Sequence, residues 1–497
     1  MNSPGSSTGP MGALRRFYQA KGVKPILLGI LLFLVSLIIF LQVERVRGLH
    51  AWEDYQVQAK AKGDWIEYAA VKQAPVSDEL NFAMAPLLKS FAAADGDSAG
   101  AYARDFQAQF KQMFPEDLVP NGLGEFGDWQ AARPVDLTVW QVHWNTKDLL
   151  TPLKKFDAVF ADFALAVRRP EVQFPLEGTP GTGDMKPLLV NVTALTCLLE
   201  FRVLAELDGG MAGSATEDVA TMLRGAQRFA AAQTINYQML AIDLETGAIA
   251  AIWQGLAGHK WDAGQLAALE KELGALDPMG TSRRGFQFEA AFSTAAFEQS
   301  LGGPALLPAD NEVLTGLNKI SAQFPRGWYY QTMTGFRRYY DGGILASFDM
   351  EHHRMDPGAV DKVRHLEEDI VASWSPYNYL LKSLPAADPT LSFVAQAQVA
   401  LDEARVAVAL ERARLATGKY PEKLAELAPK YLAAVPGDLV TGEPLHYRTT
   451  VEGEKFVLYS VGWNMKDDGG WTAPQMQARW SEGDWVWSYE AQKQIQN

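Results

Sequence analysis

The sequence has almost no cysteine, because Cys197 is the single one among 497 residues. One thiol cannot form an internal disulfide, and no Cys/His spacing predicts a zinc site. The neighbours of Cys197 are mostly leucines, which favours a buried structural thiol over a reactive one. A chain with so little to oxidise fits oxidising and reducing compartments alike.

Signatures of catalysis are also scarce. The sequence has no His-Glu-x-x-His and no Gly-rich phosphate loop, and no nucleophile elbow is predicted. The only dense group of metal-ligand types is Asp349-Met-Glu-His-His-Arg-Met-Asp356, in which Asp349 and His353 would share a face if the segment were helical. Adjacent histidines then point to different faces, so a polar helix end is the simpler interpretation. No catalytic residue is therefore assigned.

Positive charge is under-represented, and the formal net charge is −14. Residues 1–24 contain four basic residues and no acid, which leaves −18 on the rest of the chain. A surface this acidic repels phosphate backbones, and no basic stripe offsets it. Nucleic acid is therefore not an expected partner.

One long hydrophobic run is present, over residues 25–43, and it contains no charge. As a helix it would span about 28 Å, close to the thickness of the bilayer hydrocarbon. The alternative is a cleaved signal peptide, but its apolar core would be about 7–15 residues long and followed by a small-x-small site. No such site follows Val43. We expect a transmembrane signal anchor.

Charge around this run predicts its orientation. Four basic residues precede it, whereas Arg45 and Arg47 follow it, which favours a cytoplasmic N-terminus. We therefore expect a single-pass protein of the cytoplasmic (inner) membrane. Its tail, residues 1–24, would lie in the cytoplasm and its bulk in the periplasm or outside.

Apolar residues recur at helical spacing through most of residues 44–385, which predicts a mainly α-helical domain. The clearest pattern runs from Leu188 to Leu207 and ends at Gly209-Gly210. Asp262 is a candidate N-cap for a further helix. Between 281 and 385 the pattern weakens. The predicted helices cover 51–70, 81–91, 140–168, 188–208, 216–232, 236–256, 263–273, 314–324 and 361–374.

A small α+β module is predicted from residue 391 to 497. Its first element is a helix over 391–417 that Gly418 ends, with a short helix over 421–427 behind it. Strands are predicted at 445–450, 456–461 and 483–489. Five of the fourteen tryptophans lie in the last 35 residues, either as packing against the module or as a binding surface.

This succession resembles the globular domain of type II secretion pseudopilins over about a fifth of the chain. A pseudopilin has its hydrophobic segment directly at the start of this helix, whereas about 350 residues separate the two here. The resemblance therefore implies the fold of the module but not assembly into a pilus. The whole chain is similar to single-span bacterial envelope proteins that carry such a module. The matching residues are Gly418-Lys-Tyr-Pro421, Leu424, Leu427, Tyr431-Leu432, Val435-Pro436, Asp438, Gly442-Glu-Pro-Leu-His-Tyr447, Tyr459-Ser-Val-Gly462 and Asp467-Asp-Gly-Gly470.

In calcium-binding pseudopilins the last loop holds the ion. The resemblance therefore implies a candidate calcium site at Asp467 and Asp468, with Asn464 and Asp484 as further oxygen donors. The alternative is a solvated acidic turn, because Met465 and Lys466 interrupt the donors.

Two functions stay open at this stage. The first is a non-enzymatic scaffold or interaction protein that docks on a protein partner in the envelope, with secretion as its context. The second is an extracytoplasmic hydrolase whose site in the helical domain has no sequence signature. A cleft with converging acid, His or Arg side chains would favour the hydrolase.

Overall fold

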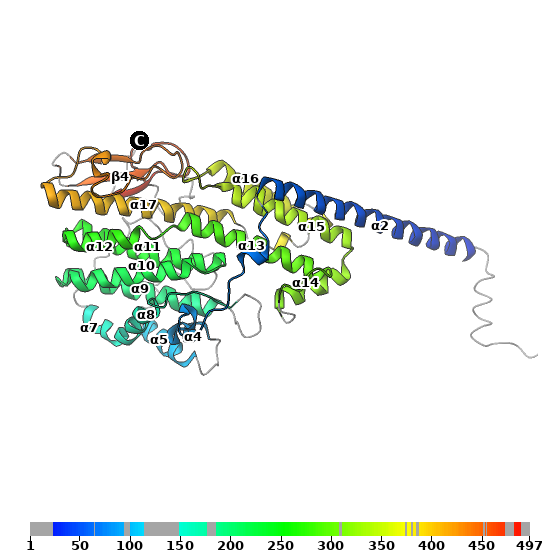
Figure 1. The fold of residues 1–497 in the computed structure, drawn as a ribbon, viewed down its shortest axis with the longest axis horizontal. Helices are drawn as coiled ribbons and strands as arrows, with labels where there is room; N and C mark the ends of the chain where they lie inside the picture. Colours follow the sequence, from blue (N-terminus) through cyan, green and yellow to red (C-terminus); the bar gives the residue numbers. More distant parts are fainter. Residues whose placement is uncertain are drawn as a thin grey trace, which may run out of the picture. The chain divides into compact units, whose positions relative to one another are not determined.

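The computed structural model describes residues 23–63, 65–93, 100–113, 149–175, 185–307, 311–372, 375–378, 381–383, 387–450, 453, 455–472 and 482–488. Within these residues the protein is mostly helical and has a small antiparallel sheet, as predicted (Figure 1). The chain forms two compact units. The first comprises residues 1–65, 316–336 and 373–384, and the second comprises residues 66–315, 337–372 and 385–497.

The first unit is built on helix α2 (Val23–Lys62), which is 40 residues long. The predicted anchor and the predicted helix over 51–70 are thus largely one continuous helix, and the prediction of two separate helices was wrong. Gly63, with φ of 78°, lies just beyond its end. The side chains of the apolar half are exposed, and the exposed fraction of Phe33, for example, is 67%. This half is long and apolar enough to span a membrane.

Two chain segments complete the first unit. Helix α14 (Glu312–Gln323) ends before Pro325 as predicted, and α15 (Arg326–Tyr339) begins directly after it. The aromatic-rich residues 328–340, for which no helix was predicted, therefore belong mostly to α15. Helix α15 runs beside α2 in Figure 1. The 3-10 turns η8 (Pro376–Asn378) and η9 (Leu381–Ser383) follow later in the chain.

The second unit is centred on helices α9 (Lys186–Asp208), α10 (Ala212–Ala230), α11 (Ile235–Ala257) and α12 (Ala263–Leu273). The predicted stripe of α9, from Leu188 to Leu207, is buried at every position. Asp262 caps α12 in a reciprocal capping box with Gln265, which confirms the predicted start.

Helix α13 (Pro278–Ser300) was not predicted. The Asp277-Pro278 pair was interpreted as the end of the preceding helix, but Asp277 accepts a hydrogen bond from the backbone N–H of Gly280 and thereby caps α13. The first turns of α13 carry small residues such as Ser282 and Gly285, which are buried. Helices packed through small side chains lack the large apolar stripe that sequence patterns detect.

Shorter helices and turns precede α9 in the chain. The elements are α3 (Tyr68–Val71), η1 (Phe82–Met84), α4 (Pro86–Ala92), α5 (Ala101–Met113), α7 (Leu150–Leu153), η5 (Lys154–Phe156) and α8 (Asp157–Ala166). Of these, α4, α5 and α7 pack on α9, whereas α3 packs on α13. The predicted helix over 81–91 is broken at Ala85. The predicted helix over 140–168 is described only from residue 149 onward, because its first part lies outside the described residues. The tail 1–22, residues 114–148 and residues 176–184 also lie outside the described residues.

Helix α17 (Asp388–Thr417) packs against α11, α12 and α13 and also against the sheet, as Figure 1 shows. Gly418 ends it in the left-handed conformation with φ of 86°, as predicted. The sheet has the order β3-β4-β5, from His446–Thr449, Phe456–Ser460 and Trp485–Ser488. The predicted short helix is the 3-10 turn η10 (Leu424–Leu427). Since α17 is buried around its whole circumference, one core continues from the bundle to the sheet.

The remaining elements connect α15 to α17. They are the π-helical turn η6 (Tyr340–Ile344), the 3-10 turn η7 (Leu345–Ser347), the two-residue strands β1 (Phe348–Asp349) and β2 (Arg354–Met355), and α16 (Pro357–Ala372). Strands β1 and β2 form an antiparallel hairpin.

Candidate functional site

The structure brings the four residues of the candidate calcium site together, with Asp484 from the segment before β5 beside the loop that holds the other three, and each carboxylate already accepts hydrogen bonds from the protein. Asp484 is 1% exposed and accepts from the backbone N–H groups of Asp468 at 3.2 Å and Gly470 at 2.6 Å. Asp467 accepts from the Tyr459 hydroxyl at 3.0 Å and from the N–H of Gly469 at 2.9 Å. The loop is therefore held closed by its own donors.

Asp468 likewise accepts hydrogen bonds, from the ammonium of Lys466 and the side-chain amide of Asn464. The Lys466 contact lowers the pKa of Asp468, and the Gly469 N–H lowers the pKa of Asp467. Among the described residues, no three His, Cys, Asp or Glu side chains converge to hold a metal. These donors fit a hydrogen-bonded turn better than calcium in this arrangement, and calcium binding stays a prediction.

The segment 349–356 is a β-hairpin, so the prediction of a helix end was wrong. Asp349 and His353 do not share a helix face. Asp349 instead pairs with His352 at 2.8 Å, and both side chains are exposed. His353 has φ of 50° in the turn, and its Nε2 lies 3.3 Å from Oδ2 of the buried Asp402 on α17. The turn brings His353 next to a carboxylate that is far away in the sequence. Sequence spacing could not indicate this pairing.

His353 and Asp402 form a dyad that reaches solvent, because the His353 side chain is 46% exposed. The hydrogen bond to Asp402 raises the pKa of His353. Gln398, one turn earlier on α17, also donates to Oδ2 of Asp402 at 3.3 Å. A histidine oriented by a buried carboxylate is the arrangement that general bases use.

Two buried glutamates lie near this dyad, and no sequence pattern marks them. Glu245 on α11 is 2% exposed, one of its carboxylate oxygens has no hydrogen-bond donor among the described residues, and burial raises its pKa strongly, with Asp402 and Asp277 adding to the effect. Glu403 is equally buried, and burial together with the nearby Asp438 raises its pKa. Both glutamates therefore favour the neutral form in the folded protein.

Glu411 lies two and a half turns further along α17 and behaves in the opposite way. Burial alone would raise its pKa, but hydrogen bonds from Arg414, Tyr420 and His259 lower it. The distances are 2.7 Å from Arg414 Nη2, 2.7 Å from the Tyr420 hydroxyl and 2.8 Å from His259 Nδ1. Glu411 is thus a charged carboxylate whose hydrogen bonds stabilise the C-terminal end of α17.

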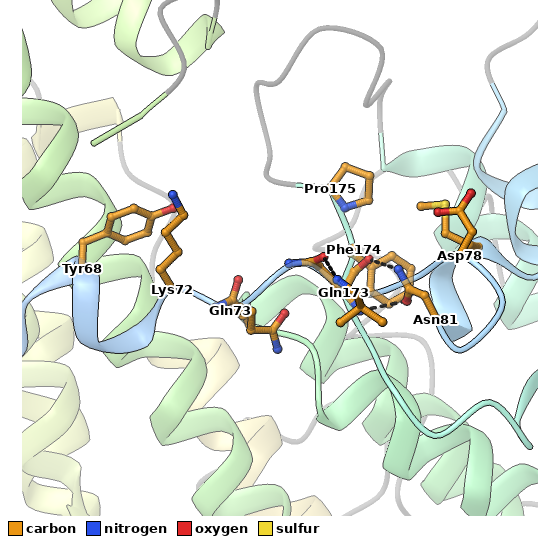
Figure 2. Close-up of a pocket in the computed structure, with 11 residues that line it drawn as sticks. Tyr68, Lys72, Gln73, Asp78, Asn81, Gln173, Phe174 and Pro175 are labelled. Atoms are coloured by element: carbon orange, nitrogen blue, oxygen red, sulfur yellow. Dashed lines mark hydrogen bonds between the residues drawn. The ribbon is translucent and has the colours of Figure 1, made fainter. Parts of the chain in front are cut away.

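A groove of about 340 Å³ lies on the second unit between the segment 68–84 and the segment 173–175. Figure 2 shows Tyr68 and Lys72 at one end and Asp78 and Asn81 at the other, with Phe174 between them. Lys72 is exposed, and its ammonium has no hydrogen-bond or ion-pair partner among the described residues. The groove therefore offers one positive charge beside an apolar surface.

Polar side chains of the groove mostly hold its walls. Asn81 donates to the carbonyl of Gln173 at 2.8 Å and accepts from its N–H at 2.9 Å, as drawn in Figure 2. Gln173 in turn accepts from the N–H of Val76 at 3.1 Å, and Gln233 donates to the carbonyl of Val71. No acid and base converge among the residues that line this groove. Its chemistry suits binding better than bond cleavage.

The sequence analysis overlooked one pattern. Gly96-Asp-Ser-Ala-Gly100 matches Gly-x-Ser-x-Gly, but a nucleophile elbow requires a strand before the serine and a helix after it. Helix α4 precedes this segment and α5 follows it, while residues 94–99 lie outside the described ones. The flanking structure does not support an elbow.

The described tryptophans of the C-terminal region favour the packing interpretation. Trp487 is fully buried, and the rings of Trp463 and Trp485 lie 5.4 Å apart. Trp480 lies outside the described residues. Cys197 on α9 is partly buried against the core.

No family model, no curated protein and no solved structure matches this chain.

Proposed function

We propose that this chain is a single-span, membrane-anchored protein of the bacterial envelope whose helical head acts outside the cytoplasm as a scaffold or interaction domain. Helix α2 carries the proposal. An 18-residue window of it has a mean hydropathy of 3.0, and none of that window is buried within the protein. By contrast, α9 is the second helix among the described residues that is long and apolar enough to span a membrane, but its window has a mean hydropathy of only 1.7 and is 67% buried, so it belongs to the core.

Two surfaces of the second unit support an interaction role. The groove carries the free ammonium of Lys72 beside apolar side chains. Strand β3 pairs only with β4 among the described strands, so its other edge presents unpaired backbone groups near Thr449. Exposed sheet edges and grooves are common docking sites for peptide segments. The pseudopilin resemblance makes an envelope secretion component the first partner to look for.

Charge substitutions test the anchor. Leu32→Arg and Ile38→Arg place charge on exposed positions inside the apolar run, at a cost of about 2.5–3.5 kcal/mol each at the bilayer centre. The double variant should leave the membrane fraction on alkaline extraction. Val57→Arg, on an exposed position of the same helix beyond the run, is the matched control and should stay membrane-bound. Equal retention of both proteins would contradict the anchor.

Site-specific photo-cross-linking tests the interaction role. A cross-linking residue at Lys72 or Thr449 should trap a discrete partner in native membranes, whereas one at the exposed Lys362 of α16 should not. Trapping of secretion components would support a role in secretion. If neither surface traps any protein, the scaffold proposal fails. Protease treatment of intact spheroplasts should degrade the head if it lies outside the cytoplasm.

The second candidate function is the extracytoplasmic hydrolase, and the His353–Asp402 dyad is the observation that favours it. A panel of ester, peptide and glycoside substrates should show turnover by the wild-type protein that His353→Gln abolishes. His352→Gln, on the exposed neighbour, is the matched control. No turnover, or equal turnover by both variants, would dismiss the dyad as a catalytic site.

A further inference from the structure

The first unit contains a collar around the base of the anchor, which we define as residues 316–336 together with 375–378 and 381–383. At Gly327 the collar is in backbone contact with α2, against Glu44, Arg45 and Gly48. Glu44 directly follows Val43, the last residue of the apolar run. At about 1.5 Å per residue, the contact at Gly48 lies only about 7 Å beyond that run. This depth corresponds to the headgroup layer of a bilayer.

Hydrogen bonds fix the collar at this depth. The Tyr377 hydroxyl donates to Glu44 Oε2 at 2.8 Å, and Arg47 donates to the same oxygen at 3.0 Å and to the Tyr377 hydroxyl at 2.5 Å. The Thr332 hydroxyl holds the carbonyl of Tyr377 at 2.7 Å, which ties the two collar segments together. Glu44 is 5% exposed and its charge is paired, so it offers little negative field to solvent.

Unpaired positive charge is present on the collar and on the adjoining turn of α2. Arg45, Lys319 and Arg326 are exposed, and none has a hydrogen-bond or ion-pair partner among the described residues. The segments 316–336 and 373–384 contain three basic residues and no acid, in a chain of net charge −14. The next acids on α2, Glu53 and Asp54, lie about 12 Å further along the helix from Arg45. Positive charge is therefore concentrated at the end of the apolar run.

Aromatic side chains occupy the same level. The ring of Trp328 lies 6.5 Å from that of Tyr377 and 6.0 Å from that of Phe324, in edge-to-face geometry. All three belong to the first unit. Tryptophan and tyrosine are enriched where a membrane protein crosses from hydrocarbon to headgroups, because their rings are apolar and their tips are polar.

We propose that the collar docks on anionic lipid headgroups at the base of the anchor, through Arg45, Lys319 and Arg326. This inference rests on the proposed membrane anchoring. Charge complementarity identifies the occupant, since Arg45 and Arg326 lie beside the end of the apolar run, Lys319 adds a third exposed cation on the collar, and the phosphate of acidic lipids is the matching charge at that depth. The docked collar then holds α2 at a fixed depth. Each cation near an anionic surface should favour the docked state by about 5-fold.

The test uses the full-length protein in vesicles of phosphatidylcholine with or without phosphatidylglycerol. A fluorophore on Asn318→Cys, in a Cys197→Ala background, reports collar contact through quenching by headgroup-spin-labelled lipid. We expect stronger quenching in vesicles that contain phosphatidylglycerol, and we expect high salt to remove the difference. Co-flotation of the protein with the vesicles is measured in the same samples and reports the anchor alone.

The decisive variant is Lys319→Glu with Arg326→Glu. It should reduce quenching in the anionic vesicles at least 5-fold and leave co-flotation unchanged. Lys260→Glu with Lys419→Glu, on exposed positions of the second unit, is the matched control and should behave as wild type. Equal quenching in both lipids, or no effect of the charge reversal, would overturn the proposal. Loss of co-flotation by the wild-type protein would instead refute the anchor.

Discussion

Gly48 of α2 and Gly327 of α15 are in backbone contact. A Cβ atom added to Gly48 would lie 2.2 Å from the carbonyl oxygen of Gly327, and one added to Gly327 would lie 2.2 Å from the carbonyl oxygen of Glu44. No side chain separates the helices at this point. Because the obstacles are backbone atoms, neither helix can yield by a change of rotamer.

Gly327→Ala should therefore loosen the collar, at a cost of about 1–3 kcal/mol for an overpacked contact. Hydrogen exchange of α15 should accelerate in its first turns. Gly316→Ala is the control, because a Cβ at Gly316 meets nothing within 4 Å. It should be neutral or slightly stabilising, since alanine favours a helix more than glycine does. Equal exchange in both variants would contradict the close contact.

His353 should make stability depend on pH. Its pKa is raised by the hydrogen bond to Asp402, so its stabilising contribution is complete below the ordinary histidine pKa of about 6.5 and is lost as the pH rises through the raised value. His353→Gln should lower the Tm at mildly acidic pH more than at alkaline pH. A Tm difference that does not change with pH would exclude this pairing. His365→Gln, on an exposed residue of α16, controls for general histidine effects.

Glu245 and Glu411 should respond oppositely to the same substitution. Burial raises the pKa of Glu245, so its ionisation costs stability as the pH rises above the ordinary carboxyl range. Glu245→Gln should therefore raise the Tm at neutral pH, and the gain should disappear in acid.

Glu411→Gln should be destabilising at neutral pH, by about 3–5 kcal/mol, because it leaves the Arg414 guanidinium without its buried partner. Thermal unfolding of both variants across pH provides the measurement. Destabilisation by both substitutions at neutral pH would show that Glu245 is ionised and paired in solution.

Asp484 should be structural whether or not calcium is present. Asp484→Asn weakens the hydrogen bonds to Asp468 and Gly470, at a cost of about 1–3 kcal/mol. The same loss is expected in chelator and in calcium. If calcium raises the Tm of the wild type, and Asp467→Ala with Asp468→Ala removes that shift, the calcium prediction is confirmed instead.

Sequence patterns predicted elements whose signals are local. The capping box at Asp262 and the left-handed Gly418 are short-range features, and the stripe of α9 repeats every turn. Helix α13 was missed because its buried contacts are made largely by small residues that leave no stripe. The segment around His353 was interpreted as a polar helix end because nothing local marks a hairpin whose strands are only two residues long.

The candidate sites were harder to predict than the fold, because they join residues far apart in sequence. His353 and Asp402 are 49 residues apart, and Tyr377 and Glu44 are 333 residues apart. The acidic loop was predicted from the resemblance of the module, yet the sequence could not reveal that Lys466 and backbone N–H groups already donate hydrogen bonds to its carboxylates. Partner choice by burial and charge is visible only in three dimensions.

The uninterrupted course of α2 has a mechanical consequence. A helix advances about 100° per residue, so the apolar half of α2 and its remaining half turn together as one rod. A contact made on the apolar half at Phe33 thereby sets the direction in which Trp52 faces at the other end. If two copies of the protein associated through their apolar halves, α2 would therefore rotate at the collar as well, because the helix is continuous from Val23 to Lys62.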